Sequence, residues 1–350
     1  MNLLQVRDLS IEFRVPSGTV KAVNGVTFGI KESTTVAIVG ESGSGKSTIA
    51  QAILGILPKP ATITEGEILF RSQKVERRKK QGFFDRKIID IAKLRNNSAA
   101  IQSIRGSQIS MIFQEPMTSL SPLHTIGNQI IEAVRLHSSI SRSEAKAAAI
   151  EILSVVGFPN PNRAIKTYPF ELSGGLRQRA MIAMALVCKP ALLIADEPTT
   201  ALDVTIQAQI LKLISDLQIK RKMAVLLITH DLGVVANVAD SVIVMYKGEV
   251  MEAGSIVDIF QNPSHPYLKS LLSAVPRFNM LEGERLKPLR DIKPTTGHLI
   301  SKAHDITAIE NRSSLILKVK NISKSYSVRS AGMVSSKKNL INAVDDVSFE

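Results

Sequence analysis

The sequence is poor in cysteine and in aromatic residues. Of its 350 residues, one is Cys and none is Trp, and aromatic residues make up 4%. A single Cys excludes a disulfide framework and a Cys-rich zinc or iron–sulfur site. The low aromatic content argues against a surface that stacks on nucleic-acid bases.

Long apolar runs are also missing. The longest, from Ala180 to Cys188, is far too short to cross a bilayer. The first residues, MNLLQVRDLSIEF, alternate in character and include Arg7 and Asp8, which is unlike a signal peptide. We therefore expect a protein that is made and kept in a reducing cytoplasm and meets a membrane from one side only.

The charge is strongly basic. Lys and Arg number 44 against 31 Asp and Glu, which gives a net charge of +13. Such a balance suits nucleic acid, nucleotides or an anionic membrane face. Residues 71–105 hold eleven of the basic residues and only three acidic ones. This basic window is either a solvated insertion or a contact with lipid headgroups or a transmembrane partner, at about 1 kcal/mol per well-placed cation.

The order of strand and helix patterns favours an α/β fold with a mainly parallel sheet. The length suits two or three domains of about 100–200 residues each. A terminal hairpin is expected from residue 241, and residues 261–310, with five Pro, look loosely structured. The patterns predict strands at 3–13, 20–30, 34–40, 66–70, 107–114, 191–198 and 224–231, and helices at 48–57 (ended by Pro58), within 126–156 and at 206–222.

One internal repeat links the two ends of the sequence. VRDLSIEF at 6–13 resembles VKNISKSY at 319–326, and KAVNGVTF at 21–28 resembles NAVDDVSF at 342–349. The alternative is a chance similarity of two edge hairpins. Because both blocks recur in the same order, we expect residues 311–350 to begin a second copy of the first domain that ends before it is complete.

A glycine-rich loop stands between a predicted strand and a predicted helix. Its sequence GESGSGKS fits the pattern G-x-x-x-x-G-K-[ST], which cradles phosphates with backbone N–H groups. In this pattern Lys46 neutralises the β- and γ-phosphates and Ser47 ligates Mg²⁺, while the helix aims its positive end at the anion. The predicted phosphate-binding residues are Gly40, Glu41, Ser42, Gly43, Ser44, Gly45, Lys46, Ser47 and Thr48.

A second motif, which is acidic, supplies the other half of a phosphate-transfer site. The run LLIADEP places Asp196 and Glu197 at the carboxyl end of a buried strand, where α/β folds bind their ligands. We expect Asp196 to hold Mg²⁺, directly or through water, and Glu197 to polarise the attacking water.

With the motif LSGGLRQR at 172–179, the sequence resembles the ATP-binding cassette (ABC) ATPases. Leu176 stands where the family commonly has Gln or Met. The resemblance implies a P-loop NTPase fold with an antiparallel edge subdomain and a helical signature subdomain, and ATP with Mg²⁺ as cofactors. It also implies that Ser173, Gly174 and Gly175 cap the γ-phosphate of ATP bound to a partner cassette.

The same resemblance assigns further residues. Gln114 matches the Q-loop, which contacts the metal. Ala201-Leu202-Asp203 matches the D-loop, and His230 matches the switch histidine. The residues expected to be catalytic are therefore Glu197, His230 and Gln114. Phe13 is expected to pack on adenine, with Tyr326 at the equivalent place of the second copy.

A narrower resemblance points to the oligopeptide/dipeptide importer branch, which also includes glutathione, microcin-type peptide and nickel importers. It rests on MIFQEPMTSLSP and on PSHPYLKSLL at 263–272. Since Cys188 is the single Cys, the iron–sulfur site of some members is not expected. The implied domains are an ABC ATPase at 1–255, an importer-type extension at 256–310 and an incomplete second cassette at 311–350.

The resemblance implies the motor subunit of a bacterial peptide importer on the cytoplasmic face of the inner membrane. Its partners would be two transmembrane permease subunits, a second cassette and, indirectly, a periplasmic substrate-binding protein, with no nucleic acid. The alternatives are a soluble ABC ATPase of DNA repair or translation, and an inert fragment that binds ATP. The sequence does not show the cargo.

Overall fold

The computed structural model describes residues 1–16, 18–77, 84–114, 119–199, 202–274, 317–328 and 339–349. The chain divides into two compact units, Met1–Leu289 and Arg290–Glu350. None of the helices among the described residues has the length and apolar character needed to span a bilayer.

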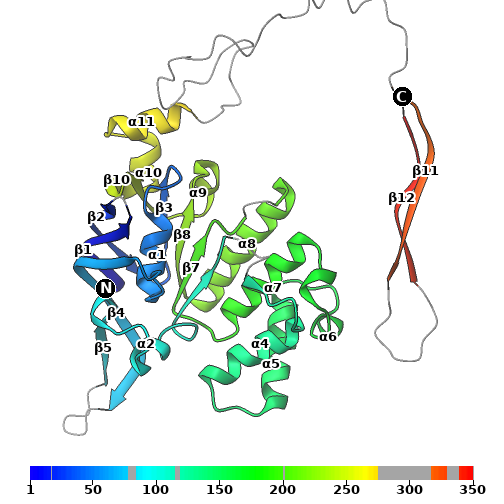
Figure 1. Ribbon diagram of the computed structural model, residues 1–350, viewed down its shortest axis with the longest axis horizontal. Coiled ribbons are helices and arrows are strands. Elements are labelled where there is room, and N and C mark those ends of the chain that lie inside the picture. Colours follow the sequence, from blue (N-terminus) through cyan, green and yellow to red (C-terminus); the bar gives the residue numbers. More distant parts are fainter. Residues whose placement is uncertain are drawn as a thin grey trace, which may run out of the picture. The chain divides into compact units, whose positions relative to one another are not determined.

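A six-stranded sheet forms the centre of the first unit (Figure 1). Its inner strands run parallel, and only the pairing of β9 with β10 is antiparallel. The apolar inner strands are buried on both faces, as expected for a parallel sheet covered on both sides. This confirms the predicted mainly parallel α/β fold. The order is β10 (Glu249–Ser255), β9 (Ser241–Tyr246), β3 (Thr35–Gly40), β8 (Ala224–Thr229), β7 (Leu192–Asp196) and β6 (Ile109–Ile112).

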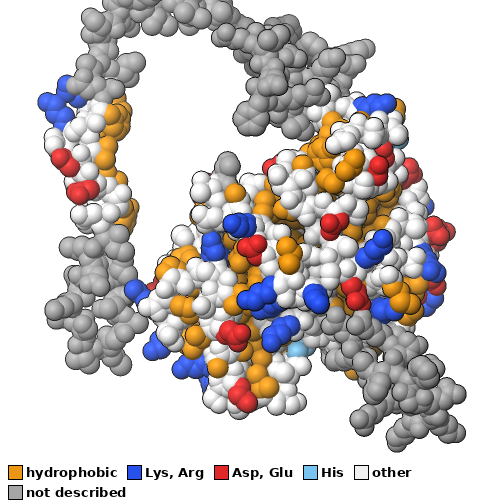
Figure 2. Space-filling view, turned by 180° about the vertical axis from the view of Figure 1, so that it is seen from behind, with side chains coloured by type: hydrophobic (Ala, Val, Ile, Leu, Met, Phe, Trp, Pro, Cys, Tyr) orange, Lys and Arg blue, Asp and Glu red, His pale blue; other side chains and the backbone are white. Residues whose placement is uncertain are grey.

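An antiparallel sheet of four strands accompanies it, in the order β2-β1-β4-β5. Its bounds are β1 (Asn2–Val15), β2 (Gly18–Lys31), β4 (Ala61–Arg77) and β5 (Phe84–Asp90). The basic window therefore begins as the end of β4 and continues through β5, η1 (Ile91–Lys93) and α2 (Ala99–Gln102). Residues 78–83 of the window lie outside the described residues. On the face shown in Figure 2, basic, acidic and apolar side chains are intermixed.

The two faces of the six-stranded sheet belong to different apolar clusters. Val36 and Ile38 of β3 pack with α1 (Lys46–Leu54) and the antiparallel sheet. Ala37 and Val39 point the other way, into a cluster shared with the remaining long helices. As a result, α1 and α7 lie on opposite faces of the sheet (Figure 1). The helices in the second cluster include α4 (Ile126–His137), α5 (Arg142–Val155), α6 (Pro161–Ala164), α7 (Gly174–Leu186), α8 (Val204–Arg221) and α9 (Leu232–Val238), with the short turn η2 (Pro169–Glu171) before α7.

Two predicted details were wrong. Helix α1 ends at Leu54, before Pro58, because Gly55 adopts a left-handed conformation with φ 62° and caps the helix. Within the segment expected to be loose, residues 266–273 form a helix. This is α11 (Pro266–Ser273), which follows α10 (Ile256–Gln261); Pro266 occupies its first position, where a missing N–H costs nothing.

The described part of the second unit is a hairpin of β11 (Val319–Val328) and β12 (Asn339–Phe349). Its pairing follows that of β1 with β2: the pair Val319 and Phe349 corresponds to Val6 and Phe28 under the sequence repeat. Even a local irregularity recurs, since Asp8 and Asn321 both have positive φ, of 45° and 49°. The sequence repeat is therefore also a repeat of backbone geometry.

Candidate active site

The predicted phosphate loop joins β3 to α1. Gly43 and Gly45 have φ values of 80° and 96°, which an L side chain rarely adopts. A Cβ atom at Gly40 would collide with the carbonyl oxygen of Met245, and one at Gly45 with the carbonyl oxygen of Ala22. The glycines are thus required by conformation and by close packing. Gly45 precedes α1 without a side chain to cap it, so an anion is the natural partner for the first N–H groups.

Lys46 is held inside this loop. Its Nζ donates to the carbonyl oxygens of Gly40 at 2.8 Å and Glu41 at 2.7 Å, and to Ser44 Oγ at 3.3 Å. Burial lowers the pKa of the Lys46 ammonium, although the neighbouring carboxylates, Glu197 first, oppose this shift. A phosphate at the loop would stabilise the charged form.

Ser47 and Asp196 meet across the space between α1 and β7. Ser47 Oγ donates to Asp196 Oδ1 at 3.1 Å, and the Asp196 side chain is almost fully buried. Burial raises the pKa of Asp196, and the charge of Glu197 adds to this. A hydroxyl and a carboxylate that carries an unfavourable buried charge are suitable partners for a hard divalent cation. The residues present therefore fit Mg²⁺.

Glu197 lies between two side chains from neighbouring strand ends. Gln114 Nε2 donates to Glu197 Oε2 at 2.6 Å, and His230 Nδ1 lies 3.0 Å from Oε1. The three residues follow β6, β7 and β8, whose carboxyl ends meet at one edge because these strands are parallel. Glu197 has φ 46° and donates its N–H to Ile228 O at 2.8 Å, which fixes how its side chain leaves the strand. The structure thus brings together the three residues predicted to be catalytic.

Phe13 lies on the hairpin that borders the phosphate loop. It is half-buried against the apolar cluster and pairs with Val20, two residues from the Ala22 carbonyl that faces Gly45. This position is suitable for a contact with a base whose phosphates occupy the loop. The role of Phe13 in adenine binding remains a prediction.

The signature residues lie elsewhere. Ser173 occupies the N-cap position of α7 without a capping hydrogen bond from its side chain, and the helix begins with Gly174 and Gly175 on the sheet face opposite α1. A Cβ atom on Gly175 would approach Ile206 Cγ2 at 3.1 Å, and Asp203 Oδ1 accepts from Ile206 N at 3.0 Å. The signature residues, with Leu202 and Asp203 of the D-loop, are therefore gathered beside the start of α8, separate from the phosphate loop of the same chain; Ala201 lies outside the described residues.

One support of the phosphate loop was missed by sequence reasoning. Gly248, in the turn between β9 and β10, donates its N–H to Ser44 O at 3.2 Å and accepts from Asn24 N at 2.8 Å. In the sequence, Lys247-Gly248 is typical of the tight turn of the hairpin predicted from residue 241. Nothing in the sequence indicated that this turn contacts the phosphate loop. Lys247 and Gly248 have φ values of 47° and 87°.

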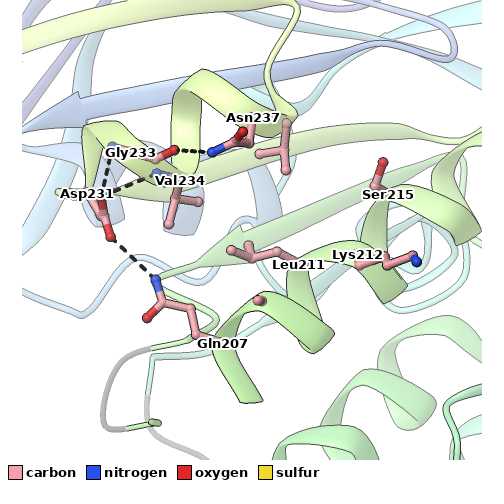
Figure 3. A pocket seen from close by; sticks show the side chains of 10 residues that line it. Gln207, Leu211, Lys212, Ser215, Asp231, Gly233, Val234 and Asn237 are labelled. Atoms are coloured by element: carbon pink, nitrogen blue, oxygen red, sulfur yellow. Dashed lines mark hydrogen bonds between the residues drawn. The ribbon is translucent and has the colours of Figure 1, made fainter. Parts of the chain in front are cut away.

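A hollow of about 530 Å³ lies between α8 and α9, and Asp231, the residue after His230 in the sequence, lines it (Figure 3). Gln207 Nε2 donates to Asp231 Oδ2 at 3.4 Å, while Asp231 Oδ1 accepts from the N–H groups of Gly233 and Val234. Asp231 therefore fixes the start of α9, and with it the backbone that carries His230.

A second hollow, of about 330 Å³, is lined by Phe113, the residue that precedes Gln114 in the sequence. It separates the end of α1 from α4 and α7, and Phe113 in it is 41% exposed. Apolar and basic groups share its lining: Leu54, Ile56, Arg105, Gly106, Ile109, Ser110, Met111, Phe113, Ser119, Ala133, His137, Met181, Met184 and Ala185.

Comparison with known proteins decides the family. The profile described as ABC transporter matches residues 23–200. The chain belongs to the ABC transporter family. A second profile, of the C-terminal region of oligopeptide/dipeptide transporters, matches residues 251–301. The match to the ABC transporter profile confirms the predicted ABC ATPase fold and ATP as the nucleotide, and it identifies the chain as an ATPase of this family.

Curated ABC relatives cover most of the chain. It is 48% identical over 293 residues to the dipeptide transport ATP-binding protein DppD of Bacillus subtilis, which covers 83% of this chain and 82% of DppD. The glutathione import ATP-binding protein GsiA of Escherichia coli is 42% identical over 355 residues, covering 100% of this chain and 54% of GsiA. The chain thus spans about half the length of GsiA.

A solved ABC cassette has the same fold. A dimeric post-hydrolysis structure of the ATP-binding cassette MJ0796, bound to ADP and Pi, matches with a TM-score of 0.60 and 27% identity. The match covers 72% of this chain and 98% of that cassette. The predicted fold class is therefore confirmed independently of the peptide-transport relatives.

Proposed function

We propose that the chain is the ATP-driven motor of a bacterial importer of peptides, acting from the cytoplasmic face of the inner membrane. The names of the relatives support this: dipeptide transport for DppD, oligopeptide transport for OppD of Bacillus subtilis, and glutathione import for GsiA. The profile match over residues 251–301 supports the same branch. The observation that supports ATP hydrolysis most directly is that Gln114, Glu197 and His230 lie in contact at one sheet edge.

In this proposal the loop of residues 40–48 binds the ATP phosphates. Its N–H groups and the Lys46 ammonium face the negative charge, while Phe13 packs on adenine. Ser47, Asp196 and Gln114 hold Mg²⁺, which when bound neutralises charge on the phosphate oxygens. The pairing of Ser47 with Asp196 supports this assignment.

Glu197 acts as the base that orients and activates water. The carboxylate is kept in place by Gln114 on one oxygen and by His230 on the other. His230 is 65% exposed on its side chain against 16% for Glu197, so the imidazole can turn towards a γ-phosphate while Glu197 stays in place.

The complete site is shared between two cassettes. Ser173, Gly174, Gly175 and Asp203 close over ATP bound to a partner, which is either another copy or a related cassette. The separation of α7 from α1 by the sheet supports this. The match to GsiA extends over the whole of this chain, and the register of the β11–β12 hairpin follows that of β1 and β2. Both observations support residues 311–350 as the beginning of a second cassette after the extension at 256–310.

Two permease subunits transmit the movement across the membrane, and a periplasmic binding protein delivers the cargo. The hollow lined by Phe113 is the proposed permease contact, because it exposes apolar surface at the residue that precedes Gln114 in the sequence. Closure of the cassettes would then move the permease, and hydrolysis would reset it.

Reconstitution tests the function. The chain, its cassette partner, two permeases and the binding protein are placed in vesicles, and uptake of labelled peptide is measured. Peptide and binding protein should stimulate ATP turnover, and uptake should stop when Glu197 is changed to Gln. Phe113→Glu should abolish binding to the permeases, whereas Ile219→Glu, at an exposed position on α8, should not. Turnover that never responds to peptide would contradict the proposal.

A further inference from the structure

The segment His265-Pro266-Tyr267 packs against the turn that supports the phosphate loop. The rings of Tyr267 and Tyr246 lie 4.6 Å apart between centroids and are tilted by 34°. Tyr246 is the last residue of β9 and pairs with Glu249 across the turn. The extension thus contacts this turn directly.

The position of Tyr267 is fixed on three sides. Glu252 of β10 accepts hydrogen bonds from Ser264 N at 3.0 Å and from His265 N at 2.8 Å. His265 Nδ1 accepts from Tyr267 N at 3.1 Å and so caps α11. Leu268, the next residue, is fully buried in the apolar cluster. Since backbone, cap and core all hold this turn of helix, the Tyr267 ring has little freedom to leave Tyr246.

The turn that follows Tyr246 contacts the phosphate-binding loop. The Gly248 N–H donates to Ser44 O, and the carbonyl oxygen of Met245 lies against Gly40. The turn therefore packs against the phosphate loop at both of these residues. Asn24 on β2 holds the other side of the turn: its N–H donates to Gly248 O and its Nδ2 to Glu249 Oε1 at 2.5 Å. A displacement of the turn would therefore move both ends of the loop that precedes Lys46.

We propose that Tyr267 is a positioning residue for ATP: it holds the β9–β10 turn against residues 40–44 and so pre-forms the phosphate-binding backbone. The inference rests on the phosphate role proposed above for this loop. It gives the His-Pro-Tyr segment a function at the nucleotide site of its own chain. Pre-formed sites bind more tightly because less ordering remains to be done on binding.

The test is equilibrium binding of a fluorescent ATP analogue to the full chain. Tyr267→Ala should weaken binding by roughly three- to tenfold, in the range of a lost aromatic pair. Tyr267→Phe keeps the ring and should bind like the wild type. Tyr267→Leu keeps the apolar volume and should resemble Tyr267→Ala; it replaces that variant if Tyr267→Ala fails to fold.

Phe260→Ala is the matched control. Phe260 lies in α10, is partly buried and packs on the same apolar cluster as Tyr267. It should lower the thermal midpoint as much as Tyr267→Ala while leaving the dissociation constant unchanged. Amide exchange over residues 40–46, without nucleotide, should be faster only in Tyr267→Ala.

Coupling of binding is reciprocal, so ATP should slow amide exchange over residues 264–272 in the wild type and not in Tyr267→Ala. Wild-type affinity in Tyr267→Ala, or an equal loss in Phe260→Ala, would overturn the inference. Failure of the wild type itself to bind ATP would instead refute the proposed role of the loop.

Discussion

His230 Nδ1 lies 3.0 Å from Glu197 Oε1, although 33 positions separate the two residues. They meet because β7 and β8 are parallel neighbours that end at the same level. Gln114, after β6, engages the other carboxylate oxygen at 2.6 Å. The Glu197 carboxylate is therefore held in one orientation, between Gln114 and His230.

The buried charge of Asp196 should reduce stability when no cation is present. Its pKa is raised by burial, so the protonated form is favoured in the folded chain, and stability from this group is lost as pH rises through the folded pKa. Asp196→Asn removes the charge and keeps an acceptor for Ser47. We expect its thermal midpoint, without nucleotide or metal, to exceed the wild-type value by about 2 °C at pH 7.5.

The gain should shrink when the pH is lowered to 4.5, because the raised pKa of Asp196 favours protonation of the wild-type carboxyl as the pH falls. Asp216→Asn, at an exposed position of α8, serves as control and should leave the midpoint unchanged at both pH values. A midpoint that falls in Asp196→Asn at pH 7.5 would show that the carboxylate is stabilising.

Complementation tests whether the site is shared between cassettes. Lys46→Ala damages the phosphate loop, and Ser173→Arg places a bulky cation at the start of α7. Alone, each variant should form dimers without a good site. Mixed, they should regenerate one good site per mixed dimer and recover ATP turnover. Mixed dimers that form but stay inactive would count against a shared site.

The hairpin of residues 319–349 should not be needed for hydrolysis. All residues assigned to the nucleotide site, apart from the partner's signature, lie within the first unit. A chain shortened to residues 1–316 should therefore turn over ATP at the rate of the full chain, measured at equal concentration. A loss of turnover, with the thermal midpoint preserved, would show that the hairpin contributes to the first cassette.

Much of the nucleotide site could be predicted because its chemistry is local in sequence. The phosphate loop needs glycines in fixed places, and Asp196 and Glu197 follow an apolar strand. The meeting of Gln114, Glu197 and His230 follows from parallel strands ending at one edge. The phosphate loop and the acidic strand end each leave a signature within a few residues, whereas Gln114 and His230 were assigned through the family resemblance.

Other features were missed in the sequence, some despite a local signal and one because it depends on a tertiary contact. The end of α1 at Leu54 depends on Gly55 adopting φ 62°, while Pro58 gave the stronger local signal. The contact of Gly248 with Ser44 joins segments about 200 positions apart through the turn of a hairpin. The helix of residues 266–273 was hidden by surrounding prolines, although Pro266 itself begins it.

The central claim is that Glu197 activates water at this site, and steady-state ATP hydrolysis by Glu197→Gln tests it most directly. Gln keeps the shape and one acceptor oxygen but removes the charge. Turnover should fall by roughly 10²- to 10⁴-fold while ATP affinity is retained. Lys46→Ala, measured beside it, should instead lose affinity. Unchanged hydrolysis in Glu197→Gln would contradict the account.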